Sequence, residues 1–503
     1  MQQYLRGVLL TQLTKANVAA QYRVQGRHTM SEVKQERPAS EDRTRRAATL
    51  TKARGGLVAA VLLASLLIGF TVDGPTLWGL APIAIYAVLV LVGLDIMLAS
   101  VAALVSGFLL LHIDPIDAAG MLGDALGTEI VEIGLIIMLG AGLGEVLTRT
   151  KGATHLVRMI VDRFGVDTAI RAQLSIMIAS AVLVIALGTL IGAFAIAAPI
   201  VIPIAARLRF TKSGTALMMF IGGACGMFVA PFVGSMVAIR EYSGISYPEY
   251  VLTAGGPLAI VCFAVGFAVI RYCQRRPVSD DDFYDDSDIT DSTEELPKTA
   301  RHSTIAFLLT FSVLVVYGVI TRAGTSFAVV ALIVMAVATG VAARMPVNDV
   351  LKAIYTGCGK LVDMFLLFWM LAALLAVVEE LRPYDVLLER FGDDLKALGV
   401  FGFLVVVALI GWLGISGASA AQVIVIDRVF GPTAAALGVP VSAWAVVLLC
   451  SCQADTFGPF PGPNMISPMA FARSTALKRM IYCGWILLSA SLVVYVVQLA
   501  VLS

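Results

Sequence analysis

Residues 450–464 read CSCQADTFGPFPGPN, and this stretch decides how the rest of the chain is interpreted. It lies between two apolar runs, Val441–Leu449 and Met465–Ala472, so a continuous helix through it would lie at bilayer depth. Three prolines and two glycines between Gly458 and Pro463 remove backbone donors and interrupt such a helix. Open backbone at that depth is tolerated only where it is buried in protein or lines a cavity. The stretch therefore predicts a broken membrane helix.

A carboxylate, Asp455, lies in the same stretch. An ionisable side chain inside a membrane is costly, and such residues mark ion or substrate pathways. Broken helices with a polar or charged group at the break are typical of the binding sites of secondary transporters. Asp455 is therefore the first candidate for a functional residue.

The composition assigns the whole chain to the membrane. Of 503 residues, 59% are hydrophobic and 14% are charged, whereas soluble domains carry about 25% charged residues. Many runs reach the roughly 20 apolar residues that a spanning helix needs. The net charge of +1 gives no electrostatic case for binding nucleic acid. The seven cysteines form no CxxC pair, so neither a zinc site nor a disulfide framework is predicted.

Apolar runs and their interruptions divide the chain into spans. The run Leu77–Leu111 is too long for one helix at about 1.5 Å per residue, and it splits near Gly93–Asp95. Two further long runs predict re-entrant hairpins, 168–206 with its tip at 188–192 and 398–430 with its tip at 414–419. The other spans are expected at about 56–72, 130–147, 214–239, 251–270, 304–320, 326–343, 362–378, 441–472 and 480–501.

The span 214–239 is expected to be interrupted twice, by Gly222–Gly226 and by Ala230–Ser235. The hydrophilic segment 271–303 separates the two halves of the chain and is rich in aspartate from Asp280 to Asp288. A charge run of this kind is usually a solvated, flexible linker.

Three short matches relate the two halves. Arg163-Phe164-Gly165 corresponds to Arg390-Phe391-Gly392, Gly188 corresponds to Gly414, and Pro231 corresponds to Pro459, at offsets of 227, 226 and 228 residues. Lysine and arginine gather in 149–171, 207–212 and 271–303, which places these loops in the cytoplasm, together with the N-terminus. Five spans and one hairpin per repeat make an odd number of crossings, so the second repeat is inverted.

These observations predict an all-α polytopic membrane protein in the cell membrane. It consists of two inverted repeats, each with five transmembrane helices and one re-entrant hairpin, plus one extra N-terminal helix, or about 11 spans in all. The expected boundaries are a basic cytoplasmic segment over 1–54, a first transmembrane helix over 55–75, repeat 1 over 76–271, an acidic cytoplasmic linker over 272–303 and repeat 2 over 304–503.

The architecture resembles the ion transporter superfamily, which includes gluconate and citrate permeases, divalent-anion:sodium symporters and Na+/H+ antiporters. The stretch Met138–Glu145, with Arg163-Phe164-Gly165 after it, is similar to the gluconate-permease pattern before its first hairpin. The tips at Gly188–Phe194 and Gly414–Gln422 lack the Ser-Asn-Thr motif of the dicarboxylate branch. The resemblance implies a homodimer in which hairpins and broken helices move by an elevator mechanism.

Candidate binding residues surround the breaks and the hairpin tips. Asp455 is expected to hold the coupling cation, and its hard oxygen suits Na+ or a proton rather than a soft metal. Free helix N-termini at the tips would suit a carboxylate. The same polar side chains could instead cap broken helix ends, and small residues could serve close helix packing. The other candidates are Thr189, Ser235, Ser416, Ser419, Gln422, Ser451, Gln453, Thr456 and Asn464.

The expected function is secondary active transport of a small organic anion, with a carboxylate favoured, coupled to Na+ or H+. The alternative is a Na+/H+ antiporter without an organic substrate, which the lack of an arginine or histidine in either broken region favours. The sequence contains no nucleophile–base pair and no phosphate-binding glycine loop, so neither an enzyme nor an ATP-driven pump is predicted. No cofactor is expected beyond the coupling ion.

Overall fold

The computed structural model describes residues 39–72, 75–288, 296–383, 385–386, 389–390, 399–412, 419–458 and 462–503. The chain divides into two compact units, Met1–Leu57 and Val58–Ser503. Helix α2 (Ala39–Gly69) begins in the first unit and ends in the second. The described elements of the second unit are helices, apart from an isolated bridge between Thr211 and Phe283.

The first half of the second unit runs in the order that the apolar pattern predicts. Its elements are η1 (Leu77–Leu80), α3 (Ala81–Leu91), α4 (Ile96–Leu110), α5 (Pro115–Ala125), α6 (Glu129–Arg149), α7 (Gly152–Phe164), α8 (Ala169–Leu187), α9 (Leu190–Arg207), α10 (Lys212–Met227), α11 (Gly234–Ser243), α12 (Tyr247–Tyr250), the π-helical turn η2 (Val251–Gly255) and α13 (Gly256–Gln274).

The linker carries two short turns, η3 (Asp280–Asp282) and η4 (Asp286–Asp288). The second half repeats the order of the first. Its described elements are α14 (Lys298–Thr321), α15 (Thr325–Ala342), α16 (Val347–Cys358), η5 (Gly359–Leu361), α17 (Val362–Glu380), α19 (Gly399–Trp412), α20 (Ser419–Ala436), α21 (Val441–Cys452), α22 (Ala454–Phe457), α23 (Pro463–Phe471) and α24 (Leu477–Leu502).

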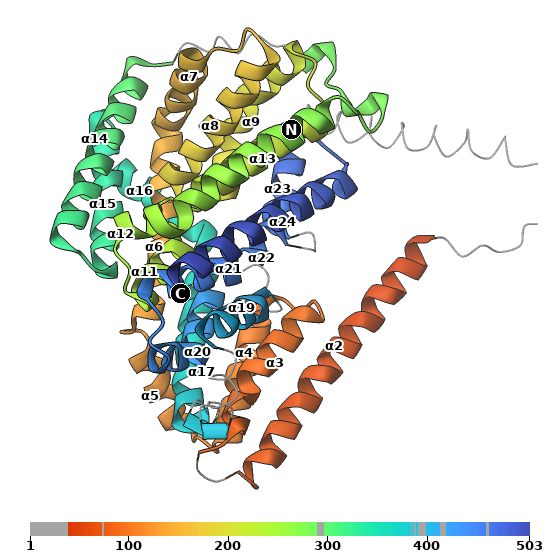
Figure 1. Cartoon of the computed structure of the whole chain (residues 1–503), viewed down its shortest axis with the longest axis vertical. Helices are drawn as coiled ribbons and strands as arrows, with labels where there is room; N and C mark the ends of the chain where they lie inside the picture. Colours follow the sequence, from red (N-terminus) through yellow and green to blue (C-terminus); the bar gives the residue numbers. More distant parts are fainter. Residues whose placement is uncertain are drawn as a thin grey trace, which may run out of the picture. The chain divides into compact units, whose positions relative to one another are not determined.

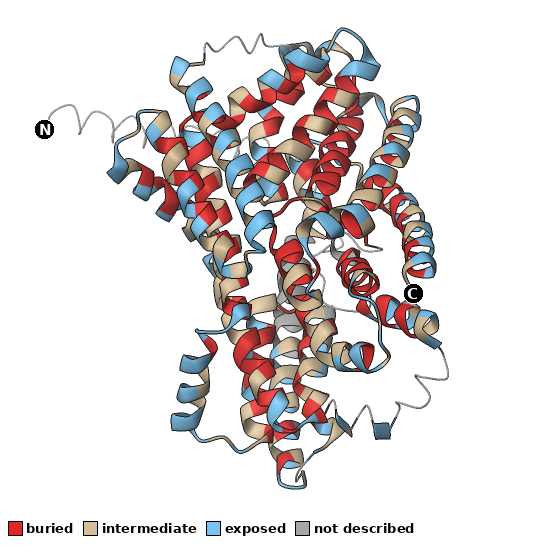
Figure 2. Ribbon diagram, turned by 60° about the vertical axis from the view of Figure 1, so that its left-hand side comes forward, coloured by how far each residue is buried: buried red, intermediate tan, exposed pale blue. Residues whose placement is uncertain are grey.

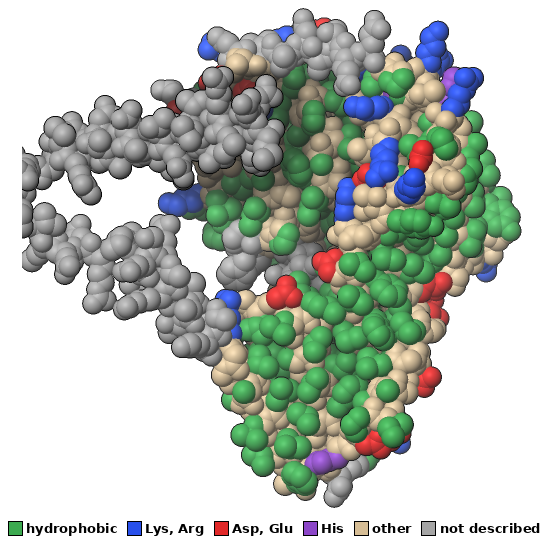
Figure 3. Space-filling view, turned by 180° about the vertical axis from the view of Figure 1, so that it is seen from behind, with side chains coloured by type: hydrophobic (Ala, Val, Ile, Leu, Met, Phe, Trp, Pro, Cys, Tyr) green, Lys and Arg blue, Asp and Glu red, His purple; other side chains and the backbone are tan. Residues whose placement is uncertain are grey.

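The membrane character of the chain is confirmed. In the described part of the chain, eight helices are long and apolar enough to cross a membrane: α6, α8, α9, α14, α15, α24 and the continuous segments Tyr247–Gln274 and Val347–Glu380. Figure 2 shows central helices that are buried nearly throughout and outer helices with an exposed face. Figure 3 shows a broad hydrophobic surface, with lysine and arginine gathered mostly toward its upper end.

The predicted split near Gly93–Asp95 is confirmed. Helix α3 ends at Leu91 and α4 begins at Ile96. Gly93 has a φ of 85°, in the left-handed region where side chains other than glycine are strained. The Asp95 side chain accepts hydrogen bonds from the backbone N–H groups of the first turn of α4, which would otherwise lack partners.

Helices that correspond in the two halves also pack in corresponding pairs. α8 packs on α10 as α19 packs on α21, and α9 packs on α23 as α20 packs on α11. One helix of each hairpin therefore packs on the broken helix of its own half, and the other helix of the hairpin packs on the broken helix of the opposite half. Figure 1 shows α8 and α9 in the upper half of the second unit and α19 and α20 in the lower half. This arrangement agrees with an inverted repeat.

Both predicted broken helices are present, but the first is broken once rather than twice. Helix α10 continues to Met227 and therefore includes Gly222–Gly226, which was expected to interrupt it. A Cβ atom on Gly222 or Gly226 would overlap the backbone of α8 at Met177 or Ala181. These glycines thus permit two helix backbones to approach closely, which is the common use of small residues in membranes.

Asp282 and Tyr284 of the acidic linker are packed against the protein, so the expectation of a solvated, flexible segment was wrong for these residues. Asp282 is 7% exposed and accepts hydrogen bonds from the backbone N–H and hydroxyl of Ser213, at 2.9 and 2.5 Å. The Arg479 guanidinium lies 3.6 Å from the same carboxylate. Tyr284 donates to the Ala472 carbonyl at 3.0 Å, and burial raises the pKa of Tyr284 to about 12.

The physical reason is that one acid in the run has a specific partner. Asp282 lies at the start of α10, where unpaired N–H groups favour a carboxylate. Composition alone does not distinguish this aspartate from its exposed neighbours. Residues 289–295 lie outside the described part of the chain.

Candidate transport site

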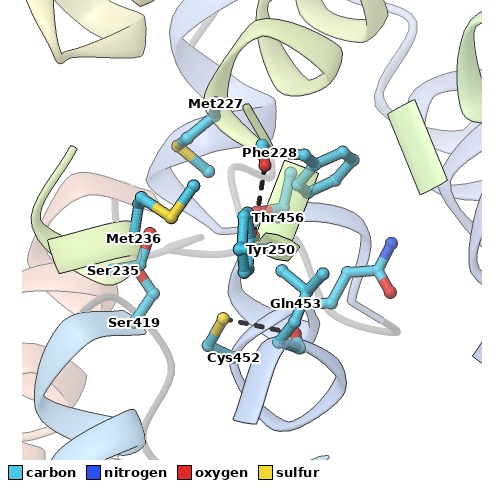
Figure 4. Close-up of a pocket in the computed structure, with 10 residues that line it drawn as sticks. Met227, Phe228, Ser235, Met236, Tyr250, Ser419, Cys452, Gln453 and Thr456 are labelled. Carbon is cyan, nitrogen blue, oxygen red and sulfur yellow. Dashed lines mark hydrogen bonds between the residues drawn. The ribbon is translucent and has the colours of Figure 1, made fainter. Parts of the chain in front are cut away.

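A small cavity lies where the two halves of the protein meet (Figure 4). Its volume is about 10 Å³, which is the space of about one water molecule. It is bordered by the first broken helix (α10 and α11), by α12, by the first residue of α20 and by the second broken helix (α21 and α22). The lining residues are Met227, Phe228, Ser235, Met236, Tyr250, Ser419, Leu449, Cys452, Gln453 and Thr456.

Two tyrosines complete the hydrogen bonding of the first break, which runs from Phe228 to Val233. The hydroxyl of Tyr250 donates to the Phe228 carbonyl at 3.1 Å, and the hydroxyl of Tyr247 donates to the Val229 carbonyl at 2.9 Å. An unpaired carbonyl at bilayer depth would be costly because no water is present there. Helix α12 therefore holds the broken backbone open at this point.

The second broken helix is held by side chains of the second hairpin. Trp412 Nε1 donates to the Cys450 carbonyl at 2.8 Å, and Gln422 Nε2 donates to the Ser451 carbonyl at 2.8 Å and to the Gly411 carbonyl. The hydroxyl of Ser451 donates to the Leu448 carbonyl at 2.7 Å. The polar groups of Gln422 and Ser451 thus bond to backbone carbonyls in this structure, and neither residue lines the cavity.

Three phenylalanines join the two broken helices beside the cavity. The Phe457 ring meets Phe220 and Phe228 edge-on, at centroid distances of 5.7 and 5.8 Å. All three side chains are buried, with Phe457 and Phe220 fully so. Edge-to-face packing is a favourable geometry for aromatic rings, so the site has a rigid apolar wall on this side.

Two helix N-termini from opposite repeats meet at the cavity. Helix α11 begins at Gly234 and α20 begins at Ser419. A Cβ atom on Gly234 would lie 3.7 Å from Ala420 Cβ, so the two helix starts are in contact. Figure 4 shows the side chains of Ser235 and Ser419 next to one another. Free N–H groups and the positive dipole end of α11, beside the hydroxyl of Ser419, favour a negative ligand at this point.

Gln453 and Thr456 border the other side of the cavity. Gln453 Nε2 donates to Ser491 Oγ at 2.7 Å, and that hydroxyl donates in turn to the Leu487 carbonyl at 2.8 Å. Gln453 Oε1 is buried and has no hydrogen-bond partner among the described residues. Figure 4 shows that the amide points away from Ser235 and Ser419, toward α24. Thr456 is 1% exposed and lies next to Tyr250.

The remaining predicted residues are not brought to the cavity. Thr189 precedes α9 and is half-buried. The adjacent Gly188 has a φ of 68°, and a Cβ there would lie 3.6 Å from the Phe232 carbonyl oxygen. The first hairpin tip therefore lies against the first break. Asn464 is the second residue of α23 and is half-buried.

Two candidates fall outside what the structure describes. Ser416 belongs to residues 413–418, which are not described. Asp455 lies in the short helix α22 between Gln453 and Thr456, but its side chain is not among the described ones. Among the described residues, no group of three His, Cys, Asp or Glu side chains could hold a metal ion. The predicted Na+ site at Asp455 stays a prediction.

One charged residue near the first break was missed. The first broken helix was expected to end at Ile239, but α11 continues to Ser243 and therefore includes Arg240. The break itself, Phe228–Val233, contains no arginine, but Arg240 follows it by seven residues on α11. A helix end is difficult to place from an apolar pattern that fades into polar residues, although Arg240 is visible as the first cation after the break.

Comparison with known proteins assigns the architecture. Residues 112–500 match the DcuC family of C4-dicarboxylate anaerobic carriers. The YdaH transporter of Alcanivorax borkumensis has a similar fold, with a TM-score of 0.50 at 16% identity over 75% of this chain and 86% of that chain. No curated protein matches the sequence significantly. The family match covers well over half of the chain and includes both broken helices and both hairpins, so this protein is a membrane transporter that belongs to the family of C4-dicarboxylate anaerobic carriers.

Proposed function

We propose that the protein is a secondary active transporter that moves a four-carbon dicarboxylate across the cell membrane, coupled to Na+ or H+. The observation that carries this proposal is the meeting of two helix N-termini, those of α11 and α20, at one buried cavity. The family to which the chain belongs supports the substrate class.

The electrostatics of the cavity suit a carboxylate. None of its ten lining residues is charged, and Ser235, Ser419 and Thr456 provide hydroxyl donors. Backbone N–H groups at helix starts bind anions without a full positive charge.

The size of the cavity indicates that the site must open. A four-carbon dicarboxylate has eight non-hydrogen atoms, and about 10 Å³ accommodates roughly one water molecule. Binding therefore requires the second hairpin, which contributes Ser419, to separate from α11. This movement agrees with the expected elevator mechanism and with alternating access between the two sides. We extend the proposal to a homodimer with its N-terminus in the cytoplasm.

Asp455 is the proposed coupling residue. It lies in α22 between Gln453 and Thr456, and both of these residues border the cavity. An acid at this depth would bind a cation or a proton to avoid an uncompensated charge. Arg240, seven residues beyond the first break, places a cation beside it, and this weakens the argument for a Na+/H+ antiporter.

The test is an uptake panel with purified protein in liposomes. Labelled succinate and fumarate should accumulate when a Na+ or H+ gradient is imposed, and unlabelled four-carbon dicarboxylates should compete. Citrate, gluconate and monocarboxylates should compete poorly. Gradient-driven exchange of Na+ for H+ with no dicarboxylate uptake would contradict the proposal.

A further inference from the structure

A second, larger cavity lies beside the first broken helix, between α11–α12 and the pair α14–α15. Its volume is about 600 Å³, which is within the usual range for small-molecule sites. We call it the outer vestibule, because its loops 241–250 and 321–325 belong to the side predicted to face outside. Its polar lining includes Arg240, Glu241, Tyr247, Glu249, Arg322 and Thr325.

The vestibule and the central cavity share one wall. Phe228 and Ser235 line the central cavity, whereas Phe232 and Arg240 line the vestibule. Arg240 follows Ser235 by five residues on α11, a rise of about 7.5 Å at about 1.5 Å per residue. The helix turns by about 100° per residue, so these two side chains leave α11 on different faces. A ligand in the vestibule would thus be separated from the central cavity only by the first break and α11.

Arg240 is the distinctive charge in this vestibule. Among the described residues, its buried Nε has no hydrogen-bond partner. Glu241 differs because its carboxylate accepts a hydrogen bond from the hydroxyl of Thr325. Arg322 and Glu249 are exposed to solvent. Arg240 therefore presents a half-buried guanidinium to a cavity that opens next to the break.

We propose that the outer vestibule is a recognition site at which a dicarboxylate binds through Arg240 before it reaches the central cavity. This inference rests on the proposed function and adds a residue that selects the substrate. The planar guanidinium binds carboxylates through two parallel hydrogen bonds, which a lysine cannot reproduce.

The vestibule predicts an effect that depends on the side of the membrane. In liposomes with a known protein orientation, Arg240→Gln should raise the KM for succinate offered from the outer side by about tenfold or more. The KM from the inner side and the maximal rate should stay within about twofold of wild type. Arg240→Lys should recover part of the affinity. Arg322→Gln, which changes an exposed arginine of the same cavity, is the matched control and should have little effect.

A purely structural role for Arg240 would lower Tm or alter both sides equally, and either result would overturn the inference. An unchanged outer KM in Arg240→Gln would overturn it as well, while succinate uptake by that variant would leave the proposed function intact. Calorimetric titration of succinate into the purified protein separates the two claims. Succinate binding that requires Arg240, without any transport, would support the vestibule and contradict the proposed function. Absence of both binding and transport would contradict both.

Discussion

The hydroxyl of Tyr250 donates a 3.1 Å hydrogen bond to the carbonyl of Phe228, and this contact connects α12 to the broken backbone of the first repeat. Phe228 borders the central cavity and packs edge-on against Phe457 of the second repeat. A single hydrogen bond thus helps to fix the wall at which both repeats meet.

The first prediction is that Tyr250→Phe destabilises the protein by about 1–3 kcal/mol, because it leaves the buried Phe228 carbonyl unpaired. Melting temperature in detergent measures this loss. Tyr495→Phe is the matched control, since Tyr495 is also buried but its hydroxyl has no partner among the described residues. Equal melting temperatures for the two variants would show that the Tyr250 contact has no structural importance.

The second prediction concerns the linker. Asp282→Asn should reduce the free energy of unfolding by about 3 kcal/mol, because Arg479 loses its buried partner. Limited proteolysis of the linker should also become faster. Asp281→Asn is the matched control, because Asp281 is exposed and, among the described residues, accepts a hydrogen bond only through its backbone carbonyl, from Lys212. A similar digestion rate for Asp282→Asn and Asp281→Asn would contradict a packed linker.

The third prediction concerns close helix packing. Gly226→Ala should destabilise the protein by about 1–3 kcal/mol, because the new Cβ would overlap the α8 backbone at Ala181. Gly120→Ala in the exposed helix α5 meets no atom within 4 Å. It should stabilise the protein by about 0.5–1 kcal/mol through helix propensity. The packing argument would be refuted if thermal unfolding showed the melting temperatures of both variants shifting in the same direction.

The fourth prediction concerns coupling. Asp455→Asn should abolish gradient-driven accumulation of succinate while exchange of succinate across the membrane persists. The amide preserves the shape of the side chain but cannot supply the charge that binds a cation. Uptake with and without an imposed Na+ or pH gradient measures the effect, and Tm confirms that the variant folds. A stable variant with the gradient dependence of wild type would exclude Asp455 as the coupling residue.

Local signals in the sequence predicted where the main helices begin, end and break. The prolines between Gly458 and Pro463 require a break wherever they occur, and Gly93 and Gly188 adopt left-handed conformations that end helices. These features depend on residues adjacent in the chain. The positions of the second broken helix, the α3–α4 split and the turn of the first hairpin were therefore predictable from the sequence.

Contacts between distant residues were less predictable. Gly222–Gly226 looked like a break because glycine is a poor helix former. In the structure these glycines instead let α10 approach the backbone of α8 closely. The Tyr250–Phe228 hydrogen bond spans 22 residues, and the Asp282–Ser213 hydrogen bond spans 69. Ser235, Ser419, Gln453 and Thr456 were predicted as site residues and do share one cavity. Their roles in binding stay predictions.

The central claim is that substrate binds where α11 and α20 begin, and kinetics of labelled succinate uptake in liposomes test it most directly. The double substitution Ser235→Ala and Ser419→Ala removes both hydroxyls at the helix starts and should raise the KM about tenfold with little change in Tm. Ser489→Ala removes an exposed hydroxyl that donates to the Trp485 carbonyl within α24, and this variant should transport like wild type. A double variant with the KM of wild type would contradict the account.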